Sequence, residues 1–106
     1  MKRFLIIIIL NFTFTQVINT TQGIAYSSIN EAVAEVNDYD VIVVESGIYY
    51  ERVNIWNPLT LSSSEGAIIN ASDYSRGIVV AANDVNISGF EIIGNENTIV
   101  GIEVTP

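Results

Sequence analysis

The hydrophobic positions of the chain follow two periods. Between residues 27 and 37 the apolar side chains recur at the spacing of one helix face, at Ile29, Ala32, Val33 and Val36. Ser28 precedes Glu31 by three residues, which is the spacing of a capping box. The pattern predicts one helix over residues 28–37, ended by the turn-forming residues that follow it.

From residue 41 onward the apolar positions come in short bursts rich in Ile and Val, separated by Gly, Asn, Asp and Ser. Such bursts predict short β-strands. They also recur: Leu59 and Leu61 match Val85 and Ile87 after 26 residues, and Ile68 and Ile78 match Ile92 and Ile102 after 24. A period of about 25 residues is typical of repeat architectures, in which each strand pairs with its counterpart one repeat later.

Alternation within the bursts predicts that Val85 and Ile87 point inward, whereas Asn86 and Ser88 point outward. A β-sandwich is the alternative, but it favours longer strands joined by hairpins. In the repeat interpretation, the helix covers one end of the core through Ile29, Val33 and Val36.

The first residues have the pattern of a secretory signal peptide. Lys2 and Arg3 precede an unbroken apolar run over residues 4–10, which is too short to span a membrane. We assign residues 1–22 to this signal. Cleavage is expected within 15–21, or later near the small residues Gly23 and Ala25.

The composition excludes several classes of function. The net charge is −8, with four basic and twelve acidic residues, which argues against a nucleic-acid partner. The chain has no Cys and no His, so it lacks the ligands that copper prefers. No cofactor is predicted; Ca²⁺ would accept the available oxygen ligands, but no spacing resembles a calcium loop.

The stretches "SSINEAVAEVNDYDVIVVESGIYYERVNIWNPLTL", "IINAS", "GIVVAANDVNISGFEI" and "GIEV" together resemble the N-terminal part of right-handed parallel β-helix proteins. These are the pectin-lyase-like group with carbohydrate-binding and sugar-hydrolase repeats, which also includes the periplasmic copper-associated accessory protein of nitrous oxide reduction. The resemblance implies an all-β fold, a right-handed single-stranded parallel β-helix of about three turns with an N-terminal capping α-helix. Residues 23–40 would form the capping segment and residues 41–106 the turns.

The resemblance further implies that the chain is the N-terminal part of a longer solenoid, since family members carry more turns. Its last turn would then pair with the rest of that solenoid or self-associate. Many unrelated functions use this fold, so the fold alone predicts no activity.

No catalytic or metal-binding residues are predicted, because the acidic residues are scattered and most border turns. Arg76 is placed to pair with Asp73 across a turn. Tyr50 and Trp56 are the candidates for stacking on a carbohydrate, although aromatic residues more often pack in a core. Asn70 and Asn86 begin N-x-[ST] sequons and are candidate N-glycosylation sites, with Asn70 favoured because it borders a turn.

These features predict a secreted or cell-surface β-helix segment with a structural or adhesive role and a polysaccharide or envelope glycan as its ligand. The alternative is an N-terminal fragment of a pectate-lyase-like polysaccharide lyase or glycoside hydrolase, with its catalytic turns beyond residue 106. No stable membrane span is predicted.

Overall fold

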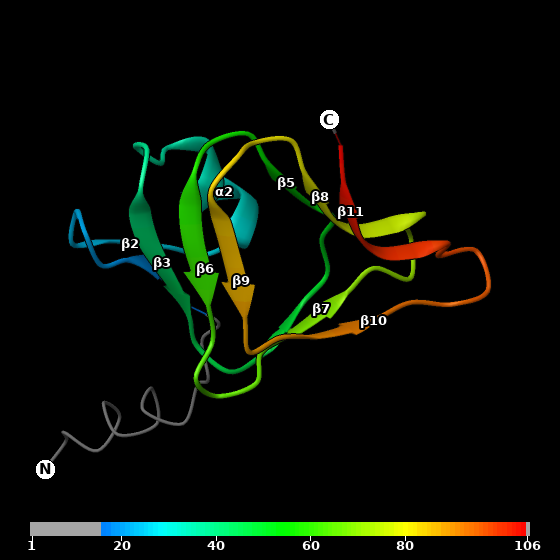
Figure 1. Ribbon diagram of the computed structural model, residues 1–106. Coiled ribbons are helices and arrows are strands. Elements are labelled where there is room, and N and C mark those ends of the chain that lie inside the picture. Colours follow the sequence, from blue (N-terminus) through cyan, green and yellow to red (C-terminus); the bar gives the residue numbers. More distant parts are fainter. Residues whose placement is uncertain (1–15, 106) are drawn as a thin grey trace, which may run out of the picture.

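The computed structural model describes residues 16–105 of the chain (Figure 1). Most of the predicted signal peptide, residues 1–15, lies outside the described residues. The described part contains one short helix and eleven strands. In chain order these are β1 (Val17–Asn19), β2 (Ile24–Tyr26), α2 (Ile29–Ala34), β3 (Asp40–Val44), β4 (Ile48–Tyr49), β5 (Val53–Ile55), β6 (Leu59–Ser62), β7 (Ile68–Asn70), β8 (Arg76–Val80), β9 (Val85–Ser88), β10 (Glu91–Ile93) and β11 (Val100–Val104).

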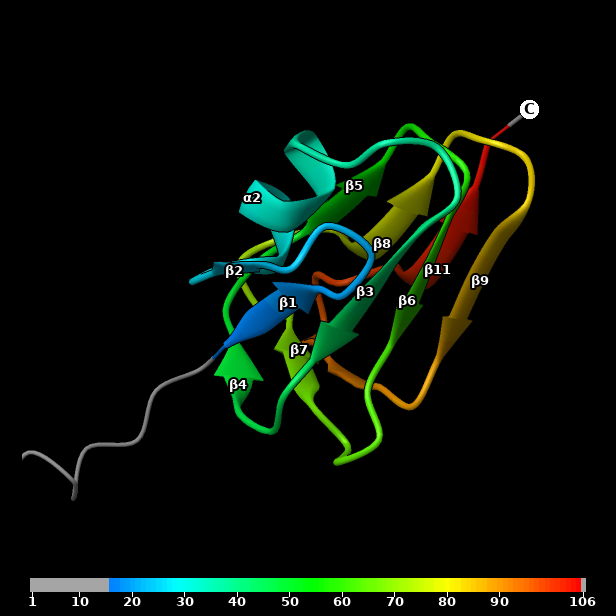
Figure 2. The same cartoon turned by 90° about the vertical axis from the view of Figure 1, so that its left-hand side faces the viewer.

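The strands form three sheets around one apolar core (Figures 1 and 2). The five-stranded sheet has the order β2-β1-β3-β6-β9, and the two three-stranded sheets have the orders β10-β7-β4 and β11-β8-β5. The three-stranded sheets are parallel, as are the β3–β6 and β6–β9 pairs. In contrast, β1 pairs antiparallel with both β2 and β3, so the five-stranded sheet is mixed.

This arrangement contradicts the predicted fold class. The described residues form a small β domain with one mixed and two parallel sheets, not a single-stranded parallel β-helix of about three turns. The physical reason lies at the edge of β3, where a parallel-only fold would leave the N–H and C=O groups unpaired. The hairpin of β1 and β2 supplies partners for that edge and introduces the antiparallel pairing.

Most of the predicted strand pairings are nevertheless present. Leu59 is opposite Val85, Leu61 is opposite Ile87, and Ile78 is opposite Ile102, as their spacing predicts. The prediction for Ile68 is wrong by one residue, because Ile68 lies opposite Glu91 and Ile92 lies opposite Ile69. The alternation in β9 is also confirmed, since Val85 and Ile87 pack against the core.

The β1–β2 hairpin is bound to the body of the domain through a buried carboxylate. Asn19 is fully buried, and its Nδ2 donates to Asp40 Oδ2 at 2.9 Å. The same oxygen accepts from Gln22 Nε2 at 2.7 Å and from the backbone N–H of Asn37 at 3.0 Å. These donors, the Asn19 amide above all, hold the pKa of Asp40 below its ordinary value. The contacts join the hairpin to the start of β3 and to the turn that precedes it.

The helix forms where the sequence predicts it but ends at Ala34 rather than at residue 37. Ser28 is the N-cap, and Glu31 completes the capping box. Glu31 also accepts from the hydroxyl and backbone N–H of Ser27, which lowers the pKa of Glu31. Ile29 and Val33 are buried as predicted, and the helix packs against β1, β2, β3 and β5.

One tight approach between neighbouring segments depends on glycine. Gly89 follows β9 with a φ of +86°. A Cβ atom at this position would lie 1.8 Å from the backbone oxygen of Ser63. The two segments are held together by the backbone N–H of Ser63, which donates to the backbone oxygen of Ser88. The connection from β9 to β10 therefore requires a residue without a side chain.

Candidate functional site

At the end of β4 one tyrosine points inward, and the tyrosine that follows β4 points outward. Tyr49 is buried, and its hydroxyl lies 2.9 Å from the backbone oxygen of Glu45. Burial raises the pKa of Tyr49. Tyr50 is 69% exposed, which is a high fraction for an aromatic side chain. The core-packing interpretation therefore holds for Tyr49 but not for Tyr50.

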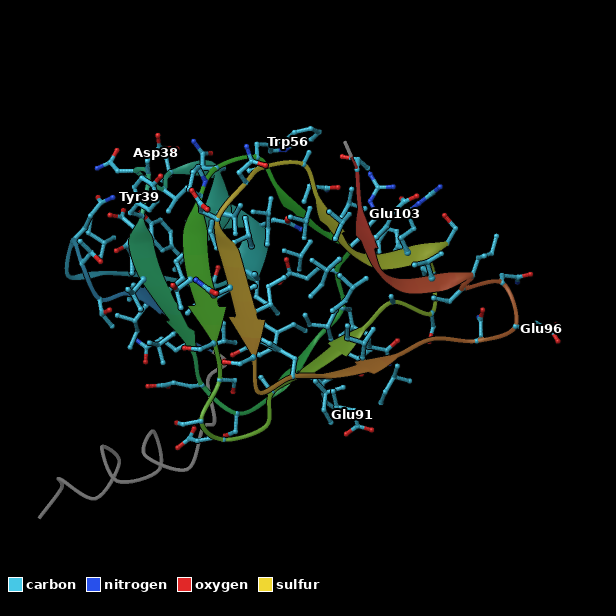
Figure 3. The ribbon with its side chains drawn as sticks, in the orientation of Figure 1. Asp38, Tyr39, Trp56, Glu91, Glu96 and Glu103 are labelled. Atoms are coloured by element: carbon cyan, nitrogen blue, oxygen red, sulfur yellow. The ribbon has the colours of Figure 1, made fainter. Side chains whose placement is uncertain are left out.

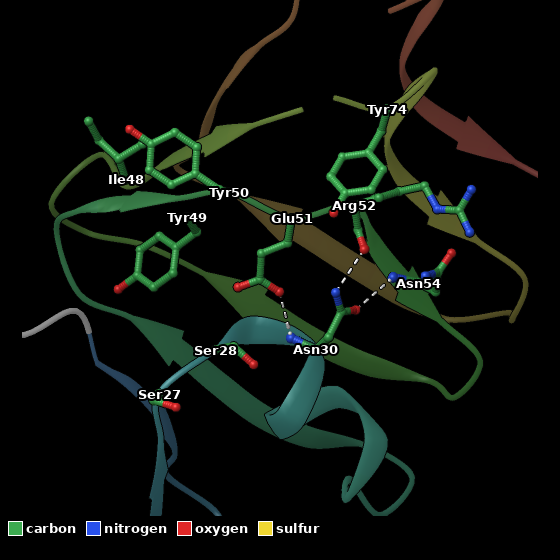
Figure 4. Close-up of a pocket in the computed structure, with 10 residues that line it drawn as sticks. All are labelled: Ser27, Ser28, Asn30, Ile48, Tyr49, Tyr50, Glu51, Arg52, Asn54 and Tyr74. Atoms are coloured by element: carbon green, nitrogen blue, oxygen red, sulfur yellow. Dashed lines mark hydrogen bonds between the residues drawn. The ribbon is translucent and has the colours of Figure 1, made fainter. Parts of the chain in front are cut away.

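Tyr50 borders an open hollow of about 600 Å³, which we call the tyrosine groove (Figure 4). Ten residues line it, from the start of α2, from the β4–β5 segment and from the turn before β8. Ile48 lies beside Tyr50 on one side, and Tyr74 lies near Arg52 on the other (Figure 4). Tyr74 is 41% exposed, so both rings present apolar surface to solvent.

Polar side chains that line the tyrosine groove form hydrogen bonds that support the fold. The two carboxylate oxygens of Glu51 accept the backbone N–H groups of Ile29 and Asn30, at 2.9 and 3.0 Å. Asn30 Nδ2 donates to the Arg52 carbonyl at 2.7 Å, and Asn30 Oδ1 accepts from the Asn54 N–H at 3.2 Å (Figure 4). Glu51 and Asn30 therefore hold the helix against β5. The groups left for a ligand are the two tyrosine rings and the Arg52 guanidinium.

A second hollow, the tryptophan groove, adjoins the first on the outer face of the β5-β8-β11 sheet. It measures about 290 Å³ and is lined by Arg52, Asn54, Trp56, Arg76, Val79 and Glu103. Asn54, Val79 and Glu103 lie opposite one another on the three strands, so they form a row across the sheet. Trp56 is 66% exposed and lies on the same side of the domain as Glu103 (Figure 3).

The charged pair in the tryptophan groove differs from the prediction. Arg76 forms an ion pair with Glu103, through its Nε, and not with Asp73. Sequence spacing favours the pair within one turn, whereas the fold places Glu103 on the neighbouring strand. Within residues 16–105 this is the one ion pair, so the Arg52 guanidinium has no carboxylate within 4.0 Å there.

Both predicted stacking residues therefore border grooves that share Arg52 and Asn54. The structure adds Tyr74, an aromatic residue that the sequence pattern did not single out. Tyr74 lies about 24 residues after Tyr50. This spacing matches the strand period of about 25 residues. The period therefore contained the information needed to predict that the rings of Tyr50 and Tyr74 lie near each other.

The acidic residues near the turns have structural partners. Asp38 Oδ1 accepts from Asn57 Nδ2 at 3.0 Å, and Asp84 Oδ2 accepts from the Tyr39 hydroxyl at 3.2 Å. The bond to Asp84 raises the pKa of Tyr39. Over residues 16–105, no three Asp, Glu, His or Cys side chains come together as metal ligands would.

The predicted glycosylation sites differ in their surroundings. Asn86 is exposed on β9, at the edge of the five-stranded sheet in the described structure. Asn70 is half-buried at the end of β7, the central strand of its sheet. Asn70 Oδ1 accepts from both the N–H and the hydroxyl of Ser72, at 3.0 and 2.7 Å.

Comparisons with known proteins give one similarity. The chain is 38% identical over 93 residues to the cell surface glycoprotein of Methanothermus fervidus. The matched segment covers 85% of this chain but 16% of that protein, so the chain spans only a small part of its relative. No family model matches the chain, and no solved structure matches it.

This similarity supports the coarser part of the sequence prediction, a cell-surface and therefore extracytoplasmic protein. The structure adds that the helix in residues 16–105 is not long and apolar enough to cross a membrane.

Proposed function

We propose that the chain is an extracytoplasmic surface domain that binds glycans along the two adjoining grooves. The observation that carries the proposal is the placement of three exposed aromatic rings, those of Tyr50, Tyr74 and Trp56, around hollows that share Arg52 and Asn54. Each exposed ring leaves apolar area in water, and a sugar ring that covers it recovers part of the cost.

The chemistry of the grooves fits a sugar better than a purely apolar ligand. The Arg52 guanidinium presents several N–H donors, and the amide of Asn54 stands between the two hollows. Sugar hydroxyls accept and donate hydrogen bonds, whereas the faces of a pyranose ring are apolar enough to stack on tyrosine or tryptophan. Aromatic rings next to fixed polar groups satisfy both requirements.

The proposed role is recognition, not catalysis. Glu51 lies in the tyrosine groove, but both of its carboxylate oxygens are bonded to the start of α2. Glu103 in the tryptophan groove is held by Arg76. Neither carboxylate is free to act as a general acid or base without breaking a contact that supports the fold.

The test is a glycan array on the full chain, followed by affinity measurements with the best ligand. A ring contact is worth about 0.5–1.5 kcal/mol, so a variant with both Tyr50→Ala and Trp56→Ala should lose about 1–3 kcal/mol and bind about 5- to 150-fold more weakly. Tyr39→Ala is the matched control, since Tyr39 is 67% exposed and lies outside both grooves. The proposal fails if the array shows no binding, or if the double variant binds as the control does.

A further inference from the structure

The described part of the chain contains three N-x-[ST] sequons, at Asn19, Asn70 and Asn86. An N-linked glycan is bulky and must extend into solvent from the folded domain. Whether the glycan is attached before or after folding, the folded state must accommodate it. The burial and the hydrogen bonds of each asparagine therefore determine which sequon is compatible with this fold.

Asn19 is incompatible with modification. Its side chain is fully buried, and its Nδ2, the atom that would carry the sugar, donates to the buried carboxylate of Asp40. Its Oδ1 accepts from the backbone N–H of Gln22. A glycan at this position would remove the contact that joins the β1–β2 hairpin to the domain.

Asn70 is half-buried, and neighbouring strands restrict it. β7 is flanked by β4 on one side and by β10 on the other, where Ile93 lies directly opposite Asn70. The hydroxyl of its sequon, that of Ser72, is bonded back to Asn70 itself. These contacts leave Asn70 with less space than an edge residue has.

Asn86 meets both requirements for carrying a glycan, because it is exposed and its side chain is not used in the hydrogen bonds of residues 16–105. It points outward from β9, between the inward Val85 and Ile87, and both Asn86 and Ser88 are exposed. Its side chain forms no hydrogen bond with any of residues 16–105. Asn86 lies opposite Thr60 on β6, and no strand of the described structure pairs with the other side of β9.

We propose that Asn86 is the N-glycosylated residue among the three sequons of the described part of the chain. In the reaction, Asn86 Nδ2 forms a bond to the anomeric carbon of a glycan carried on a lipid phosphate or diphosphate. The bond from that carbon to the phosphate oxygen breaks, the phosphate leaves with the electron pair, and the amide nitrogen loses one proton. The acceptor is the Asn86-Ile87-Ser88 sequon.

The proposed position has two structural consequences. The glycan stands on the five-stranded sheet, whereas both grooves involve the β4–β5 segment and the β5-β8-β11 sheet, so it leaves the grooves open. It also stands on β9, an edge strand of the described structure, where a bulky polar group hinders non-specific pairing with another chain. The proposal requires export but does not depend on ligand binding in the grooves.

The sequence allows the three sites to be distinguished by mass spectrometry. Beyond Lys2 and Arg3, the only cleavage sites for trypsin are Arg52 and Arg76. Digestion therefore places Asn19 in peptide 4–52, or in its shorter form where a signal has been cleaved, Asn70 in peptide 53–76 and Asn86 in peptide 77–106, which contains no other sequon. The full chain is expressed in an archaeal cell that glycosylates exported proteins, together with an exported reporter of known glycosylation.

We expect the glycan mass on peptide 77–106 of the wild-type chain. Asn86→Gln and Ser88→Ala should each remove it completely, and Ser88→Thr should keep it because threonine preserves the sequon. Glycan on peptide 53–76 or 4–52 with none on 77–106 overturns the proposal. So does an unmodified 77–106 peptide beside a glycosylated reporter, or a glycan that persists in Asn86→Gln. The wild-type result requires no variant to fold.

Discussion

Glu51 links the β4–β5 segment to the start of the helix, and its removal should destabilise the domain strongly. The carboxylate accepts the backbone N–H groups of Ile29 and Asn30, which are 22 and 21 residues away in sequence. Ser28 and Glu31 satisfy other groups at the same end. A helix of six residues gains little from propensity alone, so these partners decide whether it forms.

The expected cost follows from the two hydrogen bonds. Ile29 is fully buried, so in Glu51→Ala its N–H would have neither a partner nor water, at a cost of about 1.5–3 kcal/mol for a bond to a charged group. Asn30 is half-buried, and water can replace part of its lost bond at a cost of about 0.5–1 kcal/mol. We expect a loss of roughly 2–4 kcal/mol in the free energy of unfolding. Glu51→Gln should lose about half as much, because one amide oxygen can still accept one N–H.

The measurement is urea unfolding of the full chain, followed by far-UV circular dichroism and by Trp56 fluorescence, with coincident transitions as the test of two-state behaviour. Glu96→Ala is the control, because it removes the same charge from an exposed turn and should change stability by less than about 0.5 kcal/mol. Equal losses in Glu51→Ala and Glu96→Ala would refute the capping role. A Glu51→Gln variant as stable as the wild type would refute the requirement for two acceptor oxygens.

Two further predictions concern the backbone and pH. Gly89→Ala should lower the free energy of unfolding by more than about 2 kcal/mol, since the new side chain combines a positive φ with a clash against the Ser63 oxygen. Gly66→Ala is the control, because at φ +72° its Cβ meets no atom within 4 Å and the loss should be only about 1 kcal/mol. Equal losses in urea unfolding would contradict the close approach at Gly89. The folded-state pKa of Asp40 is depressed, so its contribution to stability is complete above the ordinary value of 3.8 and is lost as the pH falls through the lower folded value. Unfolding measured from pH 6 down to about pH 2 should therefore show a smaller decline for Asp40→Asn than for the wild type, and parallel curves would contradict this assignment.

The helix and most strand pairings could be predicted because their signals are local or periodic. Ile29 and Val33 mark the buried helix face by spacing alone, and Leu59 and Val85 mark paired strands by their repeat. The error at Ile68 arose because two isoleucines are adjacent there and again at Ile92. Either member of each doublet satisfies the period, and only the fold shows that Ile69 is the buried one, so the register was ambiguous by one residue.

The candidate site was predictable only in part. The sequence predicts Tyr50 and Trp56 as stacking candidates, and both are exposed, whereas nothing in the sequence set Tyr74 apart from other aromatic residues near turns. The role of Glu51 could not be read from the sequence, since its partners are more than twenty residues away and its neighbours carry no capping pattern. Long-range polar contacts depend on how segments meet in space, and hydrophobic periodicity contains no information about them.

The mixed sheet was missed because its first strand overlaps the predicted signal segment, and this overlap constrains export. β1 lies between β2 and β3, Val17 is fully buried, and Asn19 binds Asp40. Cleavage after residue 22 would remove all of β1, expose the edge of β3 and leave the Asp40 carboxylate without two of its donors, Asn19 and Gln22. If the chain is exported with a cleavable signal, the cleavage that preserves this fold lies before Val17, at or before the start of the predicted range of 15–21.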